Sequence, residues 1–225
     1  MRRAEMLERL VERITTQPAD RPVRVAIDGV DASGKTTLAN ELTPPLLARG
    51  RTVIRASIDG FHRPRAQRYR RGPDSPEGYY RDSFDHAALR QALLLPLGSG
   101  GSRRYRRAAY DYRADRPLLL EEEVAPENAI LLFDGVFLLR PELNDQWDYR
   151  VYVDAPFTVT LARATRRDLA LFGSLEEVVA RYERRYIPGQ RLYLQEALPR
   201  ERADVVVKNA DPEDARLAVR GDSAI

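Results

Sequence analysis

The 225-residue sequence predicts a single α/β domain of three layers, with a parallel sheet flanked by helices. Two observations predict this class. Short apolar runs alternate with amphipathic segments along the chain, and several of these runs end directly at an aspartate. In addition, 43% hydrophobic content over this length suffices for one substantial core but leaves little room for a second. We therefore treat residues 1–225 as one domain with small appended parts.

Residues 1–20 are expected to form an N-terminal helix that packs on the domain. Leu7, Leu10, Val11 and Ile14 share one face at helical spacing. The segment lacks the uninterrupted apolar core of a signal peptide, and no stretch approaches the roughly 20 apolar residues that span a bilayer. The chain has no cysteine and hence no disulfide, thiol nucleophile or thiolate metal site. We expect a cytoplasmic protein that does not bind membranes.

The remaining elements follow in order along the chain. Apolar runs predict strands at residues 23–27, 52–58, 129–133, 149–153 and 204–207, and helical periodicity predicts helices at 36–49, 84–95, 157–171 and between 174 and 197. Pro44 and Pro45 are expected to kink or interrupt the first of these helices. Residues 60–82 have no clean period and predict a long functional loop. Residues from about 98 to 124 predict a β-hairpin lobe, and those after Pro212 a short helix and a loose tail.

The eight residues from Gly29 to Thr36, GVDASGKT, form a phosphate-binding P-loop between the first strand and its helix. Its glycines let backbone amides surround phosphate oxygens, and the helix directs its positive end at them. Lys35 is expected to reach the β- and γ-phosphates and Thr36 to bind Mg²⁺. Only Lys35 and Lys208 are lysines among 37 basic residues, which indicates a need for a compact ammonium at position 35. The expected nucleotide-binding residues are Gly29, Asp31, Ala32, Ser33, Gly34, Lys35, Thr36, Thr37 and Arg166.

Two carboxylates follow apolar strands, at the edge where open α/β sheets bind their ligands. Asp134 follows residues 129–133 and is expected to hold the metal or its water. Asp59 follows the second strand and can orient an acceptor hydroxyl and take its proton. Asp59 is also a candidate metal-site residue beside Thr36 and Asp134. Both positions would equally suit ordinary Asp-Gly turns at strand ends.

Three arginines of one predicted helix suggest a lid over the phosphates, at about residues 157–186. Arg163, Arg166 and Arg167 are three and four residues apart, so at least two can face the same way. With Gly173 as a hinge, this helix would bring cations over the phosphates to stabilise the charge of the transition state. A solvated helix face is the alternative in so Arg-rich a chain.

The net charge of +3 is unevenly distributed, because residues 63–107 hold eleven arginines against four acidic residues. Such a block, with tyrosines interleaved, would suit nucleic acid. A solvated face, or attraction of small phosphorylated ligands, is the simpler interpretation. We therefore do not expect a nucleic-acid partner, whereas a homo-oligomer is left open.

Together these motifs resemble the uridine kinase and phosphoribulokinase group of P-loop kinases. The resemblance covers nearly the whole chain after residue 22, through GVDASGKT, IDGFHR, YDY, LLFDGVFLL, LARATRRD and ADVVVKN. It implies a P-loop NTPase fold and an ATP- and Mg²⁺-dependent kinase that phosphorylates the primary alcohol of a small molecule. By position, Asp59 matches the catalytic aspartate of the group, Thr36 and Asp134 its metal site, and Arg163 and Arg167 its lid.

The resemblance also places the acceptor site, for which the expected residues are Phe61, His62, Arg63, Tyr79, Tyr110 and Tyr112. Uridine kinases usually have Glu where this chain has Asp134. They have a histidine at the position of Asp115 and an aspartate at that of Tyr79, and both of these departures fall in the acceptor pocket. Uridine or cytidine is the leading acceptor, and a sugar, glycerate, pantothenate or ribulose phosphate is the runner-up.

A GTP-binding switch or a nucleic-acid-dependent NTPase is the alternative from another class. The sequence from Lys208 to Asp211, KNAD, resembles the guanine-reading N-K-x-D of GTPases. Its first two residues are reversed, which loses the base-reading asparagine. We therefore treat this match as coincidental.

Overall fold

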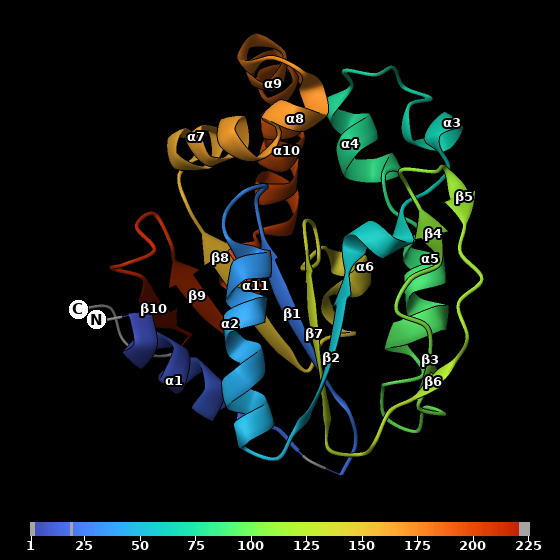
Figure 1. Ribbon diagram of the computed structural model, residues 1–225, viewed down its shortest axis with the longest axis vertical. Coiled ribbons are helices and arrows are strands. Elements are labelled where there is room, and N and C mark those ends of the chain that lie inside the picture. The colour runs from blue at the N-terminus through green and yellow to red at the C-terminus, as the bar shows by residue number, and fades with distance from the viewer. Residues whose placement is uncertain (1–2, 19, 221–225) are drawn as a thin grey trace.

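The computed structural model describes residues 3–18 and 20–220, and a six-stranded sheet lies at its centre (Figure 1). The strand order is β10-β9-β8-β1-β7-β2. Every neighbouring pair is parallel except β9 and β10. The predicted α/β class, with a parallel sheet flanked by helices, is confirmed. The strands are β1 Val23–Gly29, β2 Thr52–Ser57, β7 Ala129–Gly135, β8 Tyr149–Asp154, β9 Val205–Lys208 and β10 Arg216–Val219.

Helices cover both faces of the sheet. One face carries α1 Arg3–Thr15 and α2 Lys35–Ala48, and the other carries α5 His86–Leu89, η2 Arg90–Leu94, α6 Pro141–Asn144 and α10 Ile187–Ala197. The further short helices are η1 Ile58–Phe61, α3 Arg65–Arg68, α4 Pro76–Asp82, α7 Phe157–Arg167, α8 Leu169–Phe172, α9 Leu175–Arg181, η3 Tyr182–Tyr186 and α11 Pro199–Arg202. None of the helices in the described ranges is long and apolar enough to cross a membrane.

Strand β7 is apolar over residues 129–133 because helices cover both of its faces. Side chains alternate between the two faces of a strand, so a strand covered on both sides needs apolar residues at every position. Ile130 and Leu132 pack into the core beneath α1 and α2, whereas Leu131 and Phe133 pack into the core on the opposite face. All four side chains are fully buried.

The carboxyl ends of β1, β2 and β7 meet at one edge of the sheet, beneath α4 and the α7–α10 segment (Figure 1). The register places Asp134 of β7 between Ile27 of β1 and Ser57 of β2. Asp59 lies in η1, two residues after Ser57. Because β1 connects through α2 to β2, with β7 between them, the chain leaves a crevice at this edge, where α/β sheets bind ligands.

The hairpin lobe, expected at about 98–124, consists of two short antiparallel ladders of one hairpin. β3 Arg104–Tyr105 pairs with β6 Glu123–Val124, and β4 Tyr110–Asp111 pairs with β5 Arg116–Pro117. Neither ladder joins the central sheet.

Two expectations about local structure are wrong. The short helix expected after Pro212 is instead strand β10, whose half-buried Leu217 and Val219 alternate with exposed residues as it pairs with the edge strand β9. The remainder of that expected tail, 221–225, lies outside the described residues, as do residues 1, 2 and 19 of the expected N-terminal helix. The interruption of α2 expected at Pro44 and Pro45, as the alternative to a kink, does not occur, because the carbonyls that lose their partners belong to residues 40 and 41, which reach solvent.

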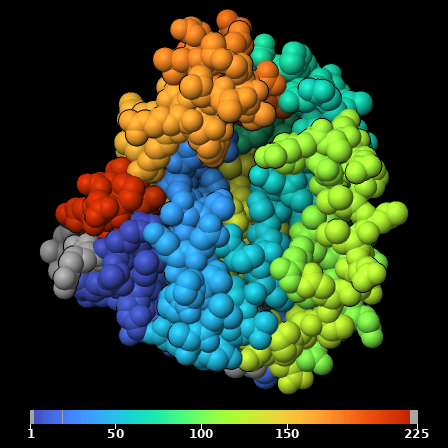
Figure 2. All heavy atoms as spheres, viewed as in Figure 1, coloured from blue at the N-terminus to red at the C-terminus, as the bar shows by residue number. Residues whose placement is uncertain are grey.

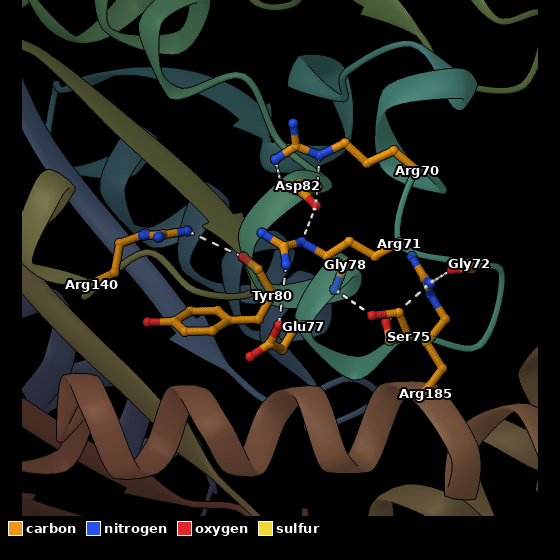
Figure 3. Close-up of polar contacts among 10 residues, drawn as sticks. All are labelled: Arg70, Arg71, Gly72, Ser75, Glu77, Gly78, Tyr80, Asp82, Arg140 and Arg185. Carbon is orange, nitrogen blue, oxygen red and sulfur yellow. Dashed lines mark hydrogen bonds and ion pairs between the residues drawn. The ribbon is translucent and has the colours of Figure 1, made fainter.

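The segment 60–82, expected to be a long loop, contains α3 and α4 and is fixed by arginine contacts (Figure 3). Arg70 and Arg71 both donate to the buried carboxylate of Asp82. Arg185 of η3 is itself buried and donates to three backbone carbonyls of this segment, at residues 72, 73 and 75. Ser75 caps α4 by accepting the backbone N–H of Gly78 at 3.0 Å.

Candidate active site

The P-loop follows β1 and opens α2, and two of its glycines are required by geometry. Gly29 has φ of 154°, and a side chain there would collide with the carbonyl of Val153 and the hydroxyl of Ser33. Gly34 has φ of 101°, and an added Cβ would stand 2.5 Å from the Asn209 amide nitrogen. These positions let the backbone curl tightly at the N-terminus of α2, which is the cradle that phosphate oxygens require.

Lys35 is buried at the first position of α2, and its Nζ donates to the carbonyl of Val30 at 2.7 Å. Burial lowers the pKa of this ammonium, whereas the carboxylates of Asp31, Asp28 and Asp134 oppose that change. The charge is therefore held beneath the loop, with acidic groups on several sides. A phosphate chain in the cradle would lie within reach of it.

Thr36 and Asp134 form a second pair at the same edge. The Thr36 hydroxyl donates to Asp134 Oδ2 at 2.6 Å, and Arg55 Nη2 of β2 donates to Asp134 Oδ1 at 2.9 Å. The same arginine donates to Asn40 Oδ1 at 3.0 Å. Sequence analysis missed Arg55, although a charge within the apolar run of β2 was a visible signal.

Asp59 is exposed at this edge of the sheet, although protein surrounds it on most sides. This enclosure raises the pKa of its carboxyl to about 6, and repulsion from Asp31 and Asp134 adds to the effect. Lys35 and Arg167 act in the opposite direction. A carboxylate with this pKa is mostly ionised at pH 7 yet basic enough to take a proton.

A cavity of about 430 Å³ lies beside the P-loop. On the other side of the P-loop, Figure 2 shows the surface hollowed below the α7–α9 segment, between α2 and the hairpin lobe. The lining of the cavity includes residues 32 and 34–37, Arg163 and Arg167 from α7, and Arg3, Asn209 and Pro212. The structure thus brings two of the three predicted lid arginines to the P-loop. Arg166 is exposed and does not line this cavity.

The α7–α9 segment contacts the P-loop directly, because Arg163 of α7 donates to the carbonyl of Ser33 at 3.4 Å. Arg163 donates to the carbonyls of Asn209 at 2.9 Å and Ala210 at 3.0 Å. Arg167 donates to Asp168 and to the Tyr182 hydroxyl at 2.9 Å. A small apolar cluster of the lid packs against Ala32 of the P-loop.

Asn209 is a site residue that sequence analysis missed. Its Nδ2 donates to the carbonyl of Ser33 at 2.7 Å, and its Oδ1 accepts from Arg3 at 3.2 Å. Both ends of the amide therefore support the P-loop and its surroundings. The residue follows β9 directly, so the rule of strand ends that located Asp134 would also have located Asn209.

On the acceptor side, two of the predicted residues lie beside Asp59. His62 stacks between Phe84 and Tyr112, with ring centroids 4.6 Å from each, and its Nδ1 lies 3.0 Å from the Asp59 carbonyl. Burial lowers the pKa of His62 to about 4, so the imidazole is neutral at pH 7. The imidazole and the phenol thus form part of an aromatic cluster next to the backbone of Asp59.

The other predicted acceptor residues have different positions. Phe61 is fully buried and packs near Phe133 in the core. The Tyr110 hydroxyl donates to Asp115 at 3.0 Å, and the backbone N–H of Arg63 donates to the carbonyl of Ser83 at 3.0 Å. Tyr79 is buried, and its hydroxyl donates to Asp31 of the P-loop at 2.6 Å. The structure therefore separates this predicted set into a surface beside Asp59 and a supporting interior.

The basic block is largely neutralised within the chain. At least seven of the eleven arginines in residues 63–107 form ion pairs with carboxylates, including Arg68 with Asp115 and Arg81 with Glu196. Paired arginines offer less attraction to a polyanion than their number suggests.

The side chains present fit a nucleotide and Mg²⁺. The glycine cradle would be filled by any side chain at position 34, and one hydroxyl and one carboxylate meet at 2.6 Å beside it. Mg²⁺ is commonly held by few protein oxygens together with phosphate oxygens. Among the described residues no group of three or more His, Cys, Asp or Glu side chains could hold a metal alone. Thr36 and Asp134 are the residues that would hold Mg²⁺.

Comparison with known sequences agrees with this geometry. The sequence profile of the Phosphoribulokinase / Uridine kinase family matches residues 25–215, which span the P-loop, helices α7 to α10 and the last parallel strand. The chain belongs to this family. The resemblance that the motifs indicated is therefore confirmed, and the protein is a kinase of the phosphoribulokinase and uridine kinase family.

Individual relatives support the same placement. The chain is 29% identical over 201 residues to uridine-cytidine kinase B of Dictyostelium discoideum, which covers 88% of this chain and 79% of the relative. It resembles the structure of a possible uridine kinase from Bacillus stearothermophilus, with TM-score 0.71 and 26% identity over 90% of this chain and 97% of that one. It also resembles a structure described as a fructose transport system kinase from Silicibacter sp. TM1040. The TM-score is 0.74 and the identity 25%, over 92% of this chain and 98% of that one.

Proposed function

We propose that this kinase transfers the terminal phosphoryl group of ATP, with Mg²⁺, to the primary hydroxyl of a small molecule, and that a pyrimidine nucleoside is its acceptor. One observation carries the proposal. Asp59, whose pKa is raised to about 6, lies at the same sheet edge as Lys35, Thr36 and Asp134. The curated relatives named as uridine kinases support the choice of nucleoside.

Each residue has a role that follows from its position. Asp59 accepts the proton of the attacking hydroxyl, because its carboxylate is exposed in the crevice and basic enough to do so. Lys35 and the P-loop amides bind the phosphate oxygens, while Arg167 stabilises the charge that develops on them. When bound through Thr36 and Asp134, Mg²⁺ would neutralise phosphate charge. His62 and Tyr112 provide an aromatic surface against which an acceptor ring can pack.

The direct test measures ADP release and the phosphorylated product by mass spectrometry, with uridine and cytidine as acceptors. We expect Asp59→Asn to lower kcat by about 10³-fold while the affinity for a fluorescent ATP analogue stays within about twofold. Asp145→Asn, at an exposed position after α6, is the matched control and should behave as the native protein. Turnover retained by Asp59→Asn would remove the carboxylate from the reaction.

A sugar is the second candidate acceptor, because the structural neighbour described as a fructose transport system kinase matches as well as the uridine kinase neighbour does. The same assay with D-fructose, D-glycerate and pantothenate separates the two candidates. Acceptors that already carry phosphate are less suited, since most arginines of residues 63–107 are paired with carboxylates.

A further inference from the structure

Asp31, the third residue of the P-loop, is held by two side chains from the far side of the crevice. The Tyr79 hydroxyl of α4 donates to its Oδ2 at 2.6 Å, and Gln190 Nε2 of α10 donates to the same oxygen at 2.7 Å. Gln190 Oε1 also accepts the Asp31 backbone N–H at 3.3 Å. Within residues 3–18 and 20–220, no hydrogen bond reaches Oδ1. One oxygen of this carboxylate is therefore available to a ligand.

Both side chains that contact Asp31 Oδ2 act as hydrogen-bond donors. A backbone N–H can only donate, so Gln190 must present its oxygen there and its NH₂ group to the carboxylate. Burial raises the pKa of Tyr79 well above its usual value, so the phenol also remains a donor. With both partners donating to Oδ2, the other oxygen of the carboxyl group, Oδ1, is left for a ligand.

The position of this carboxylate is fixed by packing. The Tyr79 ring lies edge-on to Phe137 and Tyr186, with centroids 5.0 and 4.9 Å away. Helix α10 approaches α4 so closely at Gly189 that an added Cβ would stand 2.8 Å from the carbonyl of Pro76. The donors to Asp31 are thus set before any ligand arrives, which lowers the cost of binding.

The Asp31 side chain turns away from the nucleotide cavity. Residues 32 and 34–37 line that cavity, whereas Asp31 bonds to α4 and α10. Its negative charge nevertheless acts on both Asp59 and Arg167 and raises the pKa of each. The carboxylate therefore stands near the catalytic groups but on the acceptor side of the P-loop.

We propose that Asp31 binds the acceptor, its free Oδ1 accepting a hydrogen bond from a second hydroxyl of the molecule whose first hydroxyl faces Asp59. This inference rests on the proposed function and narrows its substrate class to compounds with at least two hydroxyl groups, such as a nucleoside or a sugar. A hydroxyl bonded to a carboxylate forms a charge-assisted hydrogen bond. An acceptor that lacks the second hydroxyl leaves this charge without its partner and binds more weakly.

The test compares uridine with 2′,3′-dideoxyuridine, which keeps the primary hydroxyl and lacks the other two. For the native protein we expect kcat/KM to favour uridine by at least about 30-fold. Asp31→Asn should reduce this ratio below about 5 through a higher KM for uridine, and Asp145→Asn should leave it unchanged. Affinity for a fluorescent ATP analogue should stay within about twofold in both. Tyr79→Phe, which keeps the carboxylate but removes one of its supports, should reduce the ratio by a smaller factor and serves if Asp31→Asn does not fold.

The outcomes separate this inference from the proposed function. If neither uridine nor cytidine is phosphorylated but D-glycerate is, the nucleoside proposal fails, and D-glycerate is compared with 3-hydroxypropionate in the same way. If the native protein uses the monohydroxy analogue as well as the parent, or if Asp31→Asn retains the native ratio, only this inference is overturned. If no hydroxylated compound is phosphorylated, both are overturned.

Discussion

The Thr36 hydroxyl donates to the Asp134 carboxylate across 2.6 Å, which joins the start of α2 to the end of β7. Arg55 takes the other oxygen of Asp134 at 2.9 Å. Because both oxygens have partners, the carboxylate is fixed in place although it is buried. Its position beside the P-loop is what makes it a metal-site candidate.

Replacing Asp134 with Asn should weaken the dependence of nucleotide binding on Mg²⁺. The amide loses the negative charge that a divalent cation requires and breaks the ion pair with Arg55. We expect the Mg²⁺ concentration at half-maximal binding of a fluorescent ATP analogue to rise at least about tenfold. Asp145→Asn is the control. An unchanged Mg²⁺ midpoint would show that Asp134 does not contribute to the metal site.

Lys35 and Lys208 offer a matched pair, because they are the only lysines of the chain. Lys35→Arg should lower ATP affinity by at least about tenfold, since the planar guanidinium does not fit where the buried Nζ meets the carbonyl of Val30. Lys208→Arg, exposed at the end of β9, should bind ATP normally. Titration of both variants with a fluorescent ATP analogue checks this, and equal affinities would contradict the role of Lys35.

The raised pKa of Asp59 predicts how activity depends on pH. A general base works only when ionised, so kcat/KM should fall as the pH drops through about 6. Asp31→Asn removes a negative charge that contributes to the raised pKa, and should therefore move this acid limb to lower pH. Initial rates between pH 5 and 8.5 measure both effects. A flat profile from pH 5 to 7 would contradict the assignment of the base.

Two neighbouring arginines of α7, Arg167 and Arg166, allow a matched comparison. Arg167→Ala should lower kcat by about 10²-fold, because the guanidinium lines the nucleotide cavity near the reacting groups. Arg166→Ala removes an exposed neighbour on the same helix and should change kcat by less than about twofold. Equal losses in the two variants would indicate that the helix acts through its stability rather than through one charge.

The features that could be predicted from sequence are those determined by local pattern. Apolar runs located the parallel strands, and the rule that ligands bind at the carboxyl ends of strands located Asp59 and Asp134. The P-loop needs only its own residues and the adjoining strand and helix. Asn209 obeys the same rule at the end of β9, but its match to a GTPase motif directed attention to a different role.

The features that were missed depend on contacts between distant segments. Asp31 and Gln190 are 159 residues apart and meet only because α10 packs against α4 and the P-loop. Phe61 and His62 are adjacent, yet the turn at η1 places one in the core and the other beside the site. The hydrophobic periodicity of a sequence does not indicate in which direction the side chains of a turn point. The acceptor side is therefore the least predictable part of this chain.

The most direct test of the central claim is the formation of a nucleoside 5′-monophosphate from Mg²⁺-ATP and uridine or cytidine, detected by mass spectrometry, by the native protein and by Asp59→Asn. We expect stoichiometric ADP and monophosphate with the native protein, and about 10³-fold slower turnover with the variant at unchanged ATP affinity. Equal turnover by the two proteins, or ATP consumption without any phosphorylated acceptor, would contradict this claim.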